Sequence, residues 1–573
     1  MNEIYKILDN FRDITNTQEV IELIYVIKAW DKLSGSIIED NFTLDNFYSQ
    51  KVDVKKLAST FDKLSKTIKL FKIYKFNTKL LNDNELVNLL GLVKNISKLP
   101  TANDIFYIGK GKMDYSVSSQ IAELGVKLLD GKSKEIYVPF TNGFAYVNYT
   151  DKKIFADFQN PKNELITELI NILENKDIIF NLTNSIENPT FINPDAPHLL
   201  KEFDSVLSFP PFRLKAKLDT SNDSYHRFKI HRGTVMDVAH FEHILAQTKS
   251  KAVVLMATGF TFSSGVEEEF RKYLIQNNYL EAIIQLPPNL HSATSIETVF
   301  FIINKNKNDN LVQFINLKDE SFTIRDGRQL VLKSIDEIFD IYNNKKELEN
   351  ISTIVSNEDI ANNSFSLAID RYVIPNEVRE LQNILSSYKT VELQDIAEIR
   401  RSQLFKDEGD GKEVYELSPS DFNKAGFTKK GGKLKSIGGQ SNKYETYKLQ
   451  PYDVLLSTKG TIGKVAIIDE VSEPILASQA SQVIRVKDKA TAIELYMFLK
   501  SDIGQAMLGQ LVAGAAMPQI ATSEIKKLQI PVLSENEKKQ VLLNFNNEIK
   551  MYNEINKISI DIKQIHNNFL GVK

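Results

Sequence analysis

Short apolar segments alternate with amphipathic helical segments between about residues 100 and 310, and no other feature constrains the fold of this chain as strongly. "KEIYVPF" and "KDIIFNL" predict strands, and "NELITELINILEN" between them predicts a helix. Strands that alternate with helices pair in parallel and form a doubly wound sheet with helices on both faces. Ligands of such α/β sheets bind at the carboxyl ends of the strands, so we expect the chemistry in the loops that follow them.

Two regions with different sequence patterns flank this α/β region. Leu, Ile and Phe recur at three- and four-residue spacing near the amino terminus, and we expect Trp30, which falls in this pattern, in a helical core. From residue 391 onward glycines, turn signals and short strands predict a small α+β domain. The last segment lacks internal glycine or proline and predicts a helix that can form a coiled coil. The expected parts are a helical domain (1–98), the α/β domain (99–320), a polar connector (321–390), the α+β domain (391–534) and the long helix (535–573).

Composition limits the classes of function. The 573 residues are too many for one core. The formal net charge is -3, so any contact with nucleic acid must come from a local basic patch. The chain has no cysteine, and its seven histidines show no metal-binding spacing, so we expect no metal site. The start "MNEIYKILDN" lacks the apolar core of a signal peptide and the apolar runs have strand length, so we expect a cytoplasmic protein without a membrane segment.

The stretch "FDSVLSFPPF" has the outline of a catalytic loop: an aspartate, an apolar strand, two prolines and an aromatic residue. With "FRKYLIQNNYLEAIIQLPPNLHSATSIETVFFIINK" it resembles the N6-adenine DNA methyltransferases of type I restriction-modification systems over about residues 100–320. The resemblance implies a Rossmann-like methyltransferase domain, S-adenosylmethionine as cofactor and double-stranded DNA as substrate.

The carboxyl-terminal part resembles a target recognition domain of the specificity subunit of the same systems. "VELQDIAEIRRS" resembles its entry, "LQPYDVLLSTKGTIGKVAII" resembles its strand and Gly-x-x-Gly turn, and the final helix resembles its long helix. One such domain is half of a usual specificity subunit. The chain thus looks like a modification subunit fused to half of a specificity subunit.

The residues at the implied catalytic positions depart from the family pattern. The family places a polar residue before Pro-Pro, where it accepts a hydrogen bond from the adenine amino group. Here that residue is Phe209, which has no lone pair, although Phe212 keeps a stacking surface. A buried amino group without a partner costs about 1–3 kcal/mol. We therefore expect an inactive loop formed by Phe209, Pro210, Pro211 and Phe212.

The residues at the implied cofactor positions also depart from the family pattern. Val138 stands where the family carries an acid, and Asn142 replaces one of the glycines of the first turn. Phe158 stands at the end of the second strand, where an acid normally holds the ribose, with Asp157 beside it. We expect that this chain does not bind S-adenosylmethionine. The candidate positions are Val138, Pro139, Asn142, Gly143, Phe158 and Asn184.

A glycine-rich basic segment predicts the contact with DNA. Lysines and glycines without acids in 424–443 are typical of a loop that follows a phosphate backbone, although a solvated flexible loop has the same composition. Gln403 is a candidate base reader. The candidate DNA-binding residues are Arg400, Arg401, Gln403, Lys424, Lys429, Lys430, Lys433, Lys435, Lys443 and Lys459.

Three functions remain open from the sequence. The first is a DNA-recognition and scaffolding subunit with a degenerate methyltransferase site. It would work beside an active methyltransferase subunit and a specificity subunit or half-subunit, with or without a restriction subunit. The second is an active adenine-N6 methyltransferase with unusual motifs, which requires cofactor binding. The third is a stand-alone DNA-binding or inhibitory decoy, which a monomeric state would favour.

Overall fold

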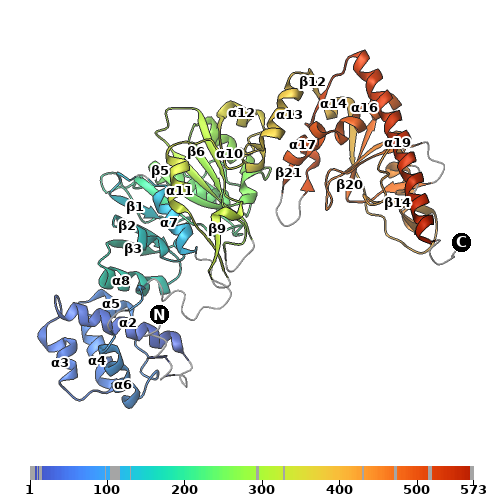
Figure 1. The fold of residues 1–573 in the computed structure, drawn as a ribbon. Coiled ribbons are helices and arrows are strands. Elements are labelled where there is room, and N and C mark those ends of the chain that lie inside the picture. Colours follow the sequence, from blue (N-terminus) through green and yellow to red (C-terminus); the bar gives the residue numbers. More distant parts are fainter. Residues whose placement is uncertain are drawn as a thin grey trace. The chain divides into compact units, whose positions relative to one another are not determined.

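The computed structural model forms two compact units, Met1–Val373 and Ile374–Lys573 (Figure 1). The residues that the structure describes are 7–8, 11, 16–96, 99–102, 117–129, 131–291, 296–326, 329–428, 432–469, 474–513 and 519–567.

The first unit begins with a group of helices around Trp30. The Trp30 side chain is fully buried, its ring contacts Phe47, Phe61 and Phe71, and its Nε1 donates a hydrogen bond to the Phe42 carbonyl at 3.0 Å. The predicted helical core is confirmed. The helices are α2 (Thr17–Ser34), α3 (Leu44–Tyr48), α4 (Val54–Leu64), α5 (Lys69–Ile73) and α6 (Asp83–Lys94).

A nine-stranded sheet forms the centre of the first unit, in the order β11-β8-β6-β7-β5-β4-β1-β2-β3. The predicted parallel pairing holds from β5 through β3, but β7 runs antiparallel to both β5 and β6. The segment from β6 to β7 is too short for a crossover helix, so the chain reverses direction there. The strands are β1 (Glu135–Val138), β2 (Lys153–Phe158), β3 (Ile178–Leu182), β4 (Phe203–Ser208), β5 (Thr248–Ala257), β6 (Leu280–Gln285), β7 (Thr298–Asn304), β8 (Leu311–Asn316) and β11 (Ser352–Ser356).

Alternate side chains of the sheet enter two separate cores. Tyr137 of β1 packs with one cluster, together with α9 and α10, whereas Val138 packs with the other, together with α7 and α8. This period of two is the expected consequence of strand geometry and buries both faces of the sheet. The predicted α/β fold is confirmed. The helices are α7 (Ser119–Lys127), α8 (Lys162–Glu174), α9 (Asp237–Ala246) and α10 (Val266–Gln276).

The segment expected as a polar connector, 321–390, is divided between the two units. Its residues up to Val373 belong to the first unit, where β11 pairs antiparallel with β8 at the edge of the sheet. An edge strand is only partly buried, so its composition is more polar than that of the central strands. The other elements are β9 (Thr323–Asp326), β10 (Gln329–Leu332), α11 (Ile335–Asn343) and α12 (Asn357–Asn362).

The second unit is an α+β domain, as predicted, with a five-stranded sheet in the order β13-β20-β17-β18-β15 and a three-stranded sheet in the order β16-β14-β19. The strands are β13 (Ala397–Arg401), β14 (Glu413–Leu417), β15 (Phe427–Thr428), β16 (Lys433–Ser436), β17 (Val454–Ser457), β18 (Val465–Ile468), β19 (Ile475–Ala477) and β20 (Ser481–Val486).

The longer helices of the second unit are α13 (Asn376–Ser386), α15 (Ser441–Tyr447), α16 (Lys489–Lys500), α17 (Asp502–Gln510) and α19 (Glu535–Asn567). They make different contacts: α16 packs against the five-stranded sheet, α17 and α19, whereas α15 packs against β19 of the three-stranded sheet. Helix α19 packs against α16 through Phe545, which is buried, whereas its later apolar side chains, such as Met551 and Ile565, are exposed. Among the described residues no helix is long and apolar enough to cross a bilayer.

Candidate functional site

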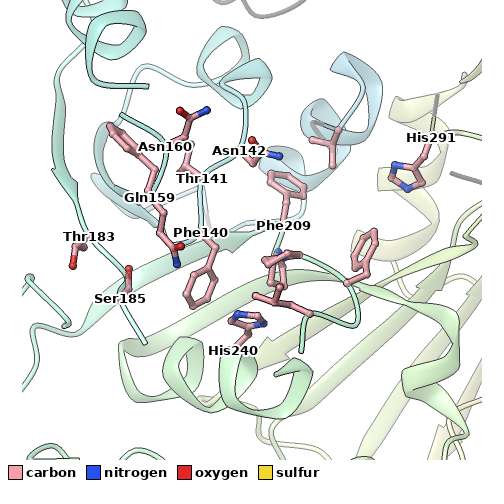
Figure 2. Close-up of a pocket in the computed structure, with 16 residues that line it drawn as sticks. Phe140, Thr141, Asn142, Gln159, Asn160, Thr183, Ser185, Phe209, His240 and His291 are labelled. Atoms are coloured by element: carbon pink, nitrogen blue, oxygen red, sulfur yellow. The ribbon is translucent and has the colours of Figure 1, made fainter. Parts of the chain in front are cut away.

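A pocket of about 230 Å³ lies at the carboxyl ends of β1, β2, β3 and β4, where the sequence predicts the chemistry (Figure 2). The loops after four neighbouring strands meet there because parallel strands end at the same edge of a sheet. The described lining residues are Val117, Phe140, Thr141, Asn142, Phe158, Gln159, Asn160, Thr183, Ser185, Phe209, Pro210, Pro211, Phe212, Leu214, His240 and His291.

The loop after β1 is held in an unusual backbone conformation. Phe140 has a φ of 58°, and Gly143 has a φ of 119°, which favours glycine. Thr141 fixes the loop, because its backbone N–H donates to the Asp157 carbonyl at 2.9 Å and its hydroxyl donates to the Val138 carbonyl at 2.9 Å. The loop therefore presents Phe140 and Asn142 to the pocket. Val138 is fully buried in the core, and Val138, Pro139 and Gly143 are not among the lining residues.

The acid at the end of β2 points away from the pocket. Asp157 is 1% exposed and accepts hydrogen bonds from the Tyr137 hydroxyl at 2.8 Å and the Thr190 hydroxyl at 3.0 Å. Burial raises the pKa of its carboxyl group. Phe158, on the opposite face, lines the pocket and stacks on Phe180, with ring centroids 5.6 Å apart. Asp157 and Phe158 thus face opposite sides of β2, as neighbouring residues of a strand do.

The residue expected after β3 does not line the pocket. The side-chain oxygen of Asn184 accepts a hydrogen bond from the Ile186 backbone N–H at 3.2 Å and so closes a turn. Its neighbours Thr183 and Ser185 line the pocket instead. An Asn after a strand commonly hydrogen-bonds to the backbone two residues further on, which accounts for the place of Asn184 in this turn.

The Pro-Pro loop after β4 forms one wall of the pocket. Phe209, Pro210, Pro211 and Phe212 all line it. Phe209 and Phe212 also pack against the core, and the tip of the Phe209 ring lies 3.5 Å from the position that a Cβ would occupy on Gly125 of α7. Phe209 is thus a packed residue, and its side chain offers no hydrogen-bond acceptor at the position before Pro-Pro.

Two histidines also line the pocket, and no motif in the sequence marks either of them. His240 of α9 is 3% exposed, and its Nδ1 has no hydrogen-bond partner in the structure. Burial lowers its pKa to about 4, with a smaller contribution from the charge of His231. Burial also lowers the pKa of His291, whose Nε2 lies 3.0 Å from the Thr298 hydroxyl. Both rings are therefore neutral at neutral pH.

A buried polar network lies beneath the pocket. Arg227 donates two hydrogen bonds to Asp223 at 2.8 and 3.0 Å, and further bonds to the carbonyls of Ser185 and Ile186 at 2.9 and 2.7 Å. Its guanidinium also lies 2.9 Å from Nδ1 of His243. Because it bonds to the backbone of the loop after β3, Arg227 holds Ser185 in place at the pocket.

The described lining residues offer no charge opposite to the cationic groups of S-adenosylmethionine. None of the described lining residues is Asp, Glu, Lys or Arg, and Asp157 is engaged on the far side of β2. The cofactor carries a sulfonium and an ammonium, and a cation in a partly buried site needs an opposite charge nearby. Within the described residues no group of three or more His, Cys, Asp or Glu side chains could hold a metal ion.

The predicted DNA-binding residues lie in the second unit, and most of those described are exposed. Arg400 is half-buried and forms an ion pair with Glu398. Lys435, in contrast, is not available to DNA as expected, because its side chain is buried. It forms an ion pair with Glu416 at 2.7 Å and donates a hydrogen bond to the Phe405 carbonyl at 3.0 Å. It points inward from β16, where side chains alternate. Lys429 and Lys430 lie outside the described residues. The exposed members are Arg401, Gln403, Lys424, Lys433, Lys443 and Lys459.

Two protein families match this chain in succession. Residues 151–381 match the family described as N-6 DNA Methylase, and residues 386–563 match the Type I restriction modification DNA specificity domain. The boundary between the matches lies close to the boundary between the two units.

Curated relatives match part of the chain. The Type I restriction enzyme MpnII methylase subunit of Mycoplasma pneumoniae is 32% identical over 182 residues, which cover 30% of this chain and 33% of that relative. The MjaVII methylase subunit of Methanocaldococcus jannaschii is 30% identical over 165 residues, or 27% of this chain and 29% of that relative. Each match thus spans only about a third of the relative's length.

Solved structures share the fold of more than half of this chain. The methyltransferase subunit of a type I restriction-modification system from Streptococcus thermophilus superposes with a TM-score of 0.51 at 18% identity, over 59% of this chain and 81% of that one. A modification subunit of a type I restriction enzyme from Vibrio vulnificus gives a TM-score of 0.51 at 13% identity, over 63% of this chain and 93% of that subunit. This chain joins a domain of the N-6 DNA methylase family to a type I restriction modification DNA specificity domain.

Proposed function

We propose that this chain is a DNA-recognition subunit of a type I restriction-modification methyltransferase complex, and that its own pocket transfers no methyl group. The observation that carries the proposal is Phe209. Adenine-N6 transfer needs a polar group that accepts a hydrogen bond from the amino group, and Phe209 instead packs toward Gly125. The absence of acids from the described lining supports the proposal independently.

Recognition of DNA is assigned to the second unit. Its exposed lysines and Gln403 can contact phosphates and base edges, respectively. A single specificity domain reads one part of a site, so the complex needs a second domain from a partner. Helix α19 is the candidate contact with that partner, because its apolar side chains beyond Phe545, such as Met551 and Ile565, are exposed.

The proposal is tested by selecting duplexes from a random pool with the purified chain. We expect enrichment of one short sequence motif and no incorporation of labelled methyl groups from S-adenosylmethionine into the selected DNA. Methylation should appear when the active modification subunit of the same system is added. Methylation by the chain alone would instead support an active methyltransferase, and a pool without any enriched motif would refute specific recognition.

A further inference from the structure

Arg400 and Arg401 are neighbours at the end of β13, but their guanidinium groups are engaged differently. Arg400 bonds to the Glu398 carboxylate through Nε and Nη2 and to the Thr446 carbonyl at 3.2 Å through Nη1. Arg401 donates a hydrogen bond from Nε to the Thr522 hydroxyl at 2.7 Å. Its side chain is exposed, and Nη1 and Nη2 have no partner among the described residues. Of the two arginines, Arg401 therefore has the free guanidinium edge.

The support of Arg401 is itself held in place. The Thr522 hydroxyl accepts a second hydrogen bond, from the side-chain amide of Gln482 at 3.0 Å, and Gln482 is 5% exposed. Gln482 of β20 lies directly opposite Arg401 in the antiparallel pair with β13, so both side chains leave the same face of the sheet. Ser402 donates to the Ser481 carbonyl at 2.8 Å and ties the end of β13 to β20. Arg401 thus stands on a fixed support.

The anchored guanidinium leaves two parallel donors, Nη1 and Nη2, for a ligand. Two donors on a rigid plane match two adjacent acceptors, and a side chain that is already anchored loses less conformational freedom when it binds. In the major groove of DNA guanine presents two adjacent acceptors, O6 and N7, whereas adenine, cytosine and thymine do not. The free edge of Arg401 is therefore complementary to guanine.

The contacts of Arg401 favour a base over a phosphate. Lys459 is exposed close to the same end of β20, where its backbone N–H donates to the Ala480 carbonyl at 3.2 Å. Its flexible ammonium can attract a phosphate without any support. The Gln482 amide and the Thr522 hydroxyl add no charge to such an attraction, but they fix the plane on which recognition of one base depends.

We propose that Arg401 reads a guanine in the major groove of the selected DNA, with Nη1 and Nη2 on O6 and N7, and that Thr522 and Gln482 are positioning residues. The inference rests on the proposed function, because it assumes that the second unit recognises a DNA sequence. It adds to that function the base, the groove and the residues that fix the reader.

The first test measures the base preference of the full chain at each position by selection from a random pool of duplexes. Arg401→Gln should lose about tenfold of the preference for guanine at one position and keep the preferences elsewhere. Because a base contact neutralises no phosphate, the slope of log K against log salt should stay the same. The matched control is Arg400→Gln, which should keep every preference, since Arg400 is occupied by Glu398 and Thr446.

The other outcomes of this selection overturn the assignment. Weaker binding of Arg401→Gln to all sequences alike, with a slope lowered by about 1, would place the guanidinium on a phosphate. Loss of a preference for A·T would place it in a narrow minor groove. If the unchanged chain enriches no motif, the proposed function and the inference both fail. If it enriches a motif that Arg401→Gln retains in full, the inference alone fails.

A base analogue tests the contact with N7. The analogue 7-deazaguanine lacks this acceptor but keeps the Watson–Crick edge of guanine. At the position that Arg401→Gln affects, it should weaken binding of the unchanged chain about tenfold and leave binding of Arg401→Gln unaltered. Equal losses in the two chains would show that another group contacts N7 and would contradict the assignment.

Two variants of Thr522 test the positioning role. Thr522→Val removes the hydroxyl at nearly constant size and should reduce the guanine preference by about three- to tenfold at that position alone. Thr522→Ser keeps the hydroxyl and should retain the preference, and thermal unfolding checks that both variants fold. Weaker binding of Thr522→Val to all sequences alike, or an equal loss of preference in Thr522→Ser, would show that the Thr522 hydroxyl does not position the reader.

Discussion

The central sheet and the carboxyl-terminal unit differ in whether polar side chains stand where each fold is expected to bind its ligand. The central sheet has the expected strands and a pocket at their carboxyl ends, but apolar side chains such as Phe158 and Phe209 stand where polar catalytic and cofactor-binding groups are expected. In the second unit the polar residues expected to contact DNA are mostly exposed, and only Lys435 of those described is buried. Burial protects a scaffold because core packing is costly to change, whereas groups that contact a ligand can change without loss of the fold.

The strongest test of this comparison addresses the scaffold beneath the pocket. Arg227→Ala should lower the free energy of unfolding of the first unit by about 3–5 kcal/mol, because it leaves the buried Asp223 without its partner. Denaturant unfolding measures the change. Arg232→Ala is the control, since Arg232 forms an exposed ion pair with Glu269 and its loss should cost less than about 1 kcal/mol. Equal effects of the two variants would show that the network does not hold the pocket.

The second test uses the pH dependence of stability. The pKa of His240 is about 4 in the folded protein and near 6.5 in the unfolded chain. The unfolded chain therefore binds more protons between these values, so the stability is complete above pH 6.5 and falls as the pH approaches 4. His240→Phe should remove on the order of 2–3 kcal/mol of this dependence. Identical pH profiles of the variant and the unchanged protein would contradict a buried neutral His240.

The third test concerns the exposed lysines of the second unit. Replacing Lys433, Lys443 and Lys459 by Gln should weaken DNA binding by about tenfold or more at low salt and reduce the slope of log K against log salt by about 2–3. Fluorescence anisotropy at several salt concentrations measures both quantities. Changing Lys550, Lys557 and Lys563, which are exposed on α19, alters the charge equally and should leave binding unchanged. A loss shared by both variants would mean that net charge, and not this surface, attracts the DNA.

The fourth test has the smallest expected effect on the free energy of unfolding. Phe209→Asn should cost about 1 kcal/mol of unfolding free energy, because a half-buried ring leaves the core at Gly125. It should not create methyl transfer, since the described lining still contains no acid. A methyl-transfer activity in this variant would show that Phe209 alone separates this pocket from a working enzyme.

Periodicity in the sequence predicted most of the fold. Apolar runs located β1 to β7, and the three- and four-residue spacing placed Trp30 in the core. It did not predict the antiparallel β7, because strand direction depends on the connection and not on the composition of the strand. It missed β11, whose polar edge position resembles a connector.

Sequence motifs predicted part of the candidate site. Asn142, Phe158 and the Pro-Pro loop line the pocket because their places follow directly from the ends of strands. The positions of Asn184 and Lys435 depended on a side-chain hydrogen bond and an ion pair that a sequence pattern does not contain. His240 comes from a helix distant in sequence from these loops, so only the folded structure brings it to the pocket.

The proposed function requires that this chain recognises DNA and does not methylate it. The most direct measurement is the transfer of labelled methyl groups by the purified chain to the duplex that it selects, at saturating S-adenosylmethionine. We predict stable binding of the duplex without incorporation of label. Incorporation at adenine N6 by the chain alone, absent from the Pro210→Ala, Pro211→Ala variant, would contradict the proposed function and identify the pocket as an active methyltransferase site.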